Sequence, residues 1–130
     1  MAELPHARAF LAQLSEVVPR GYRLVLDGDL LLLVRPDGGR AGSSSDWLTR
    51  EALLEDEVVI SAVQSLSQIQ QEIAEETTEP WPARSGPDYR GFPGPDGELV
   101  GDQLRLWFGD VDAPALALGP IDMSGVIVRE

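Results

Sequence analysis

Four glutamates spaced three and four residues apart are the most unusual chemical feature of this 130-residue sequence: Glu72, Glu75, Glu76 and Glu79. In a helix this spacing places carboxylates on one face, where they repel one another, and the C-terminal end of a helix disfavours anions. Such a face can serve solubility, contact a basic protein, or gather oxygen ligands for a divalent cation. A solvated face is the simplest explanation. Of the two functional readings we prefer the basic partner, because the sequence contains no recognised calcium loop.

A tryptophan follows these glutamates directly, in the segment Pro80-Trp81-Pro82. Proline on both sides restricts the backbone to extended conformations, so the ring is held either against the core or toward a partner. Tryptophan is enriched at the energetic centres of protein interfaces. We therefore predict a partner-binding surface made of the four glutamates and Trp81.

A second group of polar residues favours a different function. Asp88, Tyr89 and Arg90 lie in a segment rich in proline and glycine, residues 83–97, and Arg105 lies in a predicted strand. These side chains could line a small-molecule pocket between a sheet and this loop, gated by the Gly/Ser-rich segment 37–45.

Composition excludes several kinds of site. The chain has no cysteine, so disulfides, thiolate zinc sites and cysteine nucleophiles are absent. His6 is the single histidine, we expect it to be exposed on a helix, and no Gly-x-Ser-x-Gly motif accompanies it. We predict no metal site, no cofactor and no catalytic residue, and we lean against an enzyme.

Charge and hydropathy point to an acidic cytosolic protein. The net charge is −12, and two-thirds of it lies in residues 51–82, which hold eight acids and no base. This balance argues against nucleic-acid binding, which depends on Lys and Arg. The longest apolar run, 30–34, is too short to span a bilayer, and no signal peptide is evident, so we expect a cytoplasmic location. All ten basic residues are Arg, and Lys and Asn are missing, which indicates a bacterial genome of high GC content.

Apolar spacing predicts the elements of the first half of the chain. A stripe with steps of three and four residues predicts a helix over 4–18, ended by Pro19. Strands at 22–26 and 30–34 form a hairpin around Asp27-Gly28-Asp29. Because the second strand is apolar on both faces, we expect a central strand covered on both sides. Residues 36–46 read as a loop.

A long helix is predicted next, over 49–77, with a break near Glu55 as an alternative. After the loop 83–97, a second hairpin pairs 98–100 with 103–108, and short strands follow at 115–118 and 125–128. The order α-ββ-α-ββ-ββ predicts a single α+β domain over 1–130. We expect an antiparallel sheet of about four to six strands with two main helices packed on one face.

Three functions are compatible with this sequence. The first is a non-enzymatic protein-interaction module, an adaptor, chaperone or assembly factor, that uses its acidic long helix against a basic or apolar partner surface. The second is a small-molecule-binding protein or minor enzyme with the pocket described above. The third is a self-assembling component, in which the apolar second strand and Trp107 pair across a two-fold axis to give a homodimer.

Overall fold

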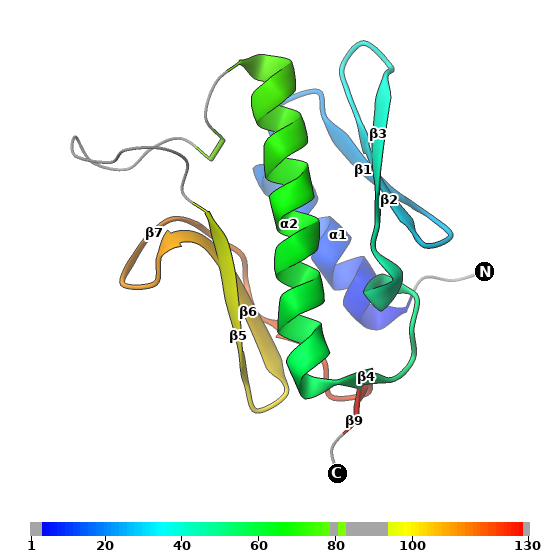
Figure 1. Cartoon of the computed structure of the whole chain (residues 1–130), viewed down its shortest axis with the longest axis vertical. Coiled ribbons are helices and arrows are strands. Elements are labelled where there is room, and N and C mark those ends of the chain that lie inside the picture. Colours follow the sequence, from blue (N-terminus) through cyan, green and yellow to red (C-terminus); the bar gives the residue numbers. More distant parts are fainter. Residues whose placement is uncertain (1–3, 79–80, 83–93, 129–130) are drawn as a thin grey trace.

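Two α-helices, two antiparallel sheets and one short parallel strand pair make up the described part of the fold in the computed structural model, which describes residues 4–78, 81–82 and 94–128. Helix α2 (Glu55–Thr77) runs through the middle of the molecule, with one sheet on each side and α1 (Pro5–Val17) behind it (Figure 1). The predicted α+β class is confirmed. The strands are divided between separate sheets instead of forming one continuous sheet.

Helix α1 forms where the apolar stripe predicts it. Its buried positions include Ala7, Phe10, Leu11 and Leu14, which recur at steps of three and four residues. Pro5 occupies the start of the helix, where a missing N–H costs nothing.

The first sheet contains β1 (Arg23–Asp27), β2 (Leu30–Val34) and β3 (Arg40–Ser44) in that order, all antiparallel. The predicted hairpin is confirmed, and Gly28 supplies its turn with a φ of 60°. The prediction of a loop over 36–46 is wrong for residues 40–44, which form strand β3. Its residues are poor strand formers, but a tight turn, in which the N–H of Arg35 donates to the carbonyl of Gly39 at 2.7 Å, folds them back along β2.

The two faces of β2 differ. Leu31 and Leu33 are buried toward the helices. On the opposite face Leu30 is 46% exposed, and Val25 of β1 is 41% exposed. The expectation that β2 is covered on both sides is therefore wrong, because the helices pack on one face only.

Helix α2 begins at Glu55 and not at the predicted Thr49. The residues before it form a short 3-10 helix, η1 (Asp46–Leu48), and β4 (Leu53–Leu54), which pairs in parallel with β9 (Ile127–Val128). Burial of Leu53 in this pairing competes with helix formation. The carboxylate of Glu57 then accepts the N–H of Leu54 at 2.8 Å, which satisfies one free donor at the helix start.

The second sheet is built around β6 (Gln103–Asp110). This strand pairs with β5 (Pro95–Val100), β7 (Ala113–Ala117) and β8 (Ile121–Asp122). The predicted hairpin around Gly101 is confirmed. Strand β5 begins at Pro95, inside the segment predicted as a loop, while residues 83–93 lie outside the described part of the chain.

Trp47 joins the two helices through buried polar contacts. Its indole Nε1 donates to the Oγ of Ser65 in α2 at 3.0 Å, and that hydroxyl also bonds the Oγ of Ser45 at 2.8 Å. On its other side, Phe10 of α1 meets the indole edge-on with ring centroids 5.1 Å apart. All of these side chains are buried, so each bond is made where water cannot replace it.

Replacing Ser65 with alanine tests this contact. The variant leaves the Trp47 indole N–H and the Ser45 hydroxyl without their shared partner, so we expect a loss of about 1–3 kcal/mol in the free energy of unfolding. Ser67→Ala, on the exposed side of the same helix, is the matched control and is expected to change little. Urea denaturation measures both, and an equal effect of the two variants would contradict the role given to Ser65.

Candidate functional site

The C-terminal end of α2 holds three of the four predicted glutamates close together. Glu72, Glu75 and Glu76 lie on its last two turns, and Glu79 lies outside the described residues. Glu76 approaches the Nε of Arg35 at 3.6 Å. Glu75 accepts the side-chain N–H of Gln71 at 3.2 Å. Glu72 borders a small hollow beneath β2 and β3.

Little positive charge compensates these carboxylates. Arg35 is the only cation within ion-pair distance of the three in the described part of the chain, and it also lies 3.7 Å from Asp37. The backbone carbonyls at this helix end add further negative potential. Among residues 4–78, 81–82 and 94–128, no group of histidines or carboxylates is arranged to hold a metal ion. The arrangement suits contact with a cationic surface.

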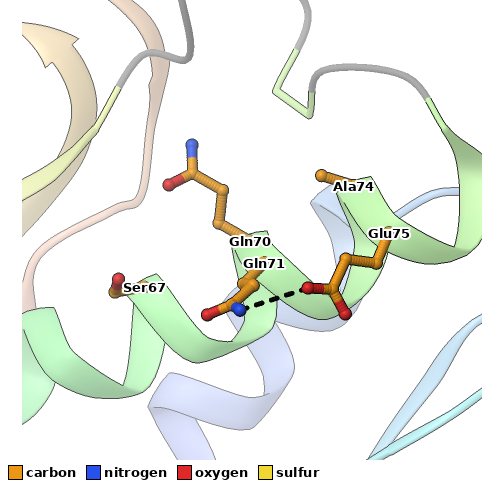
Figure 2. Close-up of a pocket in the computed structure, with 5 residues that line it drawn as sticks. All are labelled: Ser67, Gln70, Gln71, Ala74 and Glu75. Carbon is orange, nitrogen blue, oxygen red and sulfur yellow. Dashed lines mark hydrogen bonds between the residues drawn. The ribbon is translucent and has the colours of Figure 1, made fainter.

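An uncharged, hollowed surface adjoins this acidic end. Figure 2 shows Ser67, Gln70, Gln71, Ala74 and Glu75 around a cavity of about 320 Å³. A second hollow, of about 450 Å³, lies between α2 and β3. Its lining is Gly42, Ser43, Ser44, Gln64, Ser67 and Gln68. We call the uncharged residues around the two hollows the Ser/Gln surface: Gln64, Ser67, Gln68, Gln70, Gln71 and Ala74 of α2 together with Gly42–Ser44 of β3.

Sequence reasoning missed the Ser/Gln surface. The available signal was the absence of any charged residue in α2 between Glu57 and Glu72, in a chain with a net charge of −12. That signal describes only one side of the larger hollow. The other side is β3, which the sequence did not predict.

Trp81 lies against the second sheet. Its ring meets Phe108 edge-on, with centroids 5.3 Å apart, and is half-buried against the core. This contact holds the ring in place beyond the end of α2. A direct role of Trp81 in partner binding stays a prediction.

The predicted small-molecule pocket lies largely beyond the described residues. Asp88, Tyr89 and Arg90 are all outside them. Arg105 is exposed and bonds Glu98 across the hairpin at 3.3 Å. The described part of the chain thus places only Arg105, in a surface ion pair of the kind that contributes little energy.

Trp107, predicted as a dimer contact, is buried.

His6 is buried, and the expectation that it is exposed is wrong. Its Nε2 donates to the carbonyl of Trp47 at 2.9 Å, and its Nδ1 has no partner in the described structure. Burial lowers the pKa of His6, and the bond to the Trp47 carbonyl offsets part of this shift. Beside it is a cavity of about 550 Å³ whose lining includes Glu51 and Asp122. Asp122 accepts the N–H of Ser124 at 2.9 Å, which lowers its pKa.

Comparison with known proteins identifies no relative: no family model, curated protein or solved structure matches this chain. Within the described ranges, neither helix combines the length and the apolar character needed to cross a membrane.

The lowered pKa of His6 predicts a dependence of stability on pH. The unfolded chain binds a proton near pH 6.5, the ordinary pKa of histidine, whereas folded His6 resists protonation until lower pH. The unfolded state therefore binds more protons below pH 6.5, and the free energy of unfolding falls as the pH drops through this range. Carboxylates titrate mainly at lower pH, so the change between about pH 7 and 6 belongs to His6.

Denaturation curves at several pH values between these limits provide the test. His6→Gln serves as the comparison, because it removes the titrating group, and it should flatten the dependence even though it destabilises the fold. A wild-type stability that rises as the pH falls from 7 to 6 would contradict the burial of a neutral His6.

Proposed function

We propose that this protein is a non-enzymatic protein-interaction module of the cytoplasm, an adaptor, chaperone or assembly factor. Its partner presents a basic segment that docks on the acidic end of α2 and continues along the Ser/Gln surface. The observation that supports this function best is the juxtaposition of three weakly compensated carboxylates with a hollowed, uncharged helix face.

The acidic end provides attraction and orientation. Glu72, Glu75 and Glu76 lie on one helix end, beside which the described residues place one arginine, Arg35, so a cationic partner gains favourable interactions there. These interactions are mainly Coulombic and lie between solvent-exposed charges, so salt screens them. Charge complementarity of this kind raises the association rate and selects the partner more than it adds affinity.

The Ser/Gln surface provides short-range recognition. Gln64, Gln68 and Gln71 carry donors and acceptors on flexible side chains along one side of α2. Removing them from water costs much less than burying a charge. A partner can thus cover this surface without leaving an ion unpaired, which fits the neutral centre found in protein interfaces.

Neutralising the acidic end tests the proposal. In Glu72→Gln/Glu75→Gln/Glu76→Gln the shape of the helix is kept and three charges are removed. When the wild-type protein is used to capture partners from a lysate of the native host at low salt, it should retain a basic partner in stoichiometric amount. The triple variant should retain at least tenfold less of this partner. High salt should release the partner from the wild-type protein.

The matched control removes three charges from the start of α2 and the segment just before it, in Glu51→Gln/Glu55→Gln/Asp56→Asn. It has the same net charge as the test variant and should bind the partner normally. If both variants lose the same amount of captured partner, the effect is due to net charge alone. If the test variant captures as much partner as the wild-type protein, the acidic end is not the docking site.

A further inference from the structure

The outer face of the first sheet carries an apolar row that the helices leave uncovered. Val25, Leu32 and Gly42 lie opposite one another on β1, β2 and β3. Leu30 lies on the same face and is 46% exposed, and Val25 is 41% exposed. Side chains alternate between the two faces of a strand, so these residues point away from the core.

Gly42 keeps this row flat. A Cβ added at Gly42 would come within 2.9 Å of the Cδ2 of Leu32, which means that the leucine side chain lies over the glycine. At this position β3 has no side chain of its own, and the side chain of Leu32 from β2 lies over its backbone. The result is an apolar row in which Val25 and Leu32 supply the side chains and Leu32 extends over β3.

The charges on this face are separated along the strands. At one end Arg23 and Arg40 flank Val34 in register, and at the other end Asp27 lies opposite Leu30. In the described part of the chain, none of these three charged side chains has an ion-pair partner. A chain of net charge −12 thus has one face that is positive at one end and negative at the other.

We propose that this face binds a second copy of the same chain, in a symmetric dimer whose two-fold axis runs across the strands along the Val25–Leu32–Gly42 row. Rotation about this axis places Arg23 of each copy opposite Asp27 of the other. A two-fold axis along the strands would instead place Arg23 opposite Arg40, where like charges repel. Charge complementarity therefore selects one of the two symmetric packings.

The size of the face sets the strength of this dimer. The face consists of three strands of five residues each. Two copies of so small a face bury less surface than the roughly 1,200–2,000 Å² that specific stable interfaces bury. The two sheets would stack about 10 Å apart, as in a β-sandwich. The dimer is accordingly weak and reversible, and it forms at high protein concentration. Because α2 packs on the opposite side of this sheet, the α2 part of the Ser/Gln surface stays free for a partner, whereas Gly42 and Ser44 of β3 belong to both surfaces.

Sedimentation equilibrium of the full chain tests the proposal. The average mass of the wild-type protein should rise from 14.1 kDa toward twice that value between micromolar and millimolar concentration. Leu30→Asp should remain a monomer throughout. Val100→Asp changes another exposed apolar side chain, which is 54% exposed at the end of β5, and this variant should dimerise like the wild-type protein.

A charge exchange tests the symmetry without relying on a single destabilising change. Arg23→Asp alone should weaken dimerisation at least tenfold, and Arg23→Asp combined with Asp27→Arg should restore it, because each new pair again faces its opposite charge. A wild-type mass that stays at 14.1 kDa at every concentration would overturn the proposal. So would assembly beyond the dimer, equal effects of Leu30→Asp and Val100→Asp, or failure of the exchange to restore pairing.

Discussion

The position of α2 depends on the burial of one side chain, Trp47. Its buried indole lies between the two helices, where it meets Phe10 of α1 and donates to Ser65 of α2. Its backbone carbonyl accepts the Nε2–H of His6, so α1 is held by a hydrogen bond as well. An unpaired indole N–H in this position would cost free energy. The bond to the Ser65 hydroxyl therefore favours the same rotation of α2 about its axis as the burial of its apolar stripe does.

That rotation determines what the outside of the molecule offers. With Ser65 and the apolar stripe turned inward, the uncharged side of α2 faces outward between β3 and the second sheet (Figure 1). Glu76 comes to lie beside Arg35, and Glu72 beside β2 and β3 of the first sheet. One side of α2 packs in the core and the other forms the candidate binding surface. A rotation of the helix would therefore change both.

The sequence predicted those elements whose own residues determine them. Helix α1 and both hairpins follow from apolar spacing and from glycine turns at Gly28 and Gly101. Strand β3 was missed because its pairing energy comes from β2 and not from its own residues. The burial of His6 was missed for a similar reason, since its partner is a backbone carbonyl far along the chain. The acidic end of α2 was predicted from spacing, but the Ser/Gln surface depends on β3 and could not be.

Side-chain amide signals in NMR spectra test the central claim most directly. The chain has six glutamines and no asparagine, and four of the glutamines lie on α2. On addition of the captured partner, the signals of Gln64, Gln68 and Gln71 should shift or broaden. Those of Gln13 in α1 and Gln103 in β6 should stay in place. Shifts confined to Gln13 or Gln103 would contradict docking on the outer side of α2.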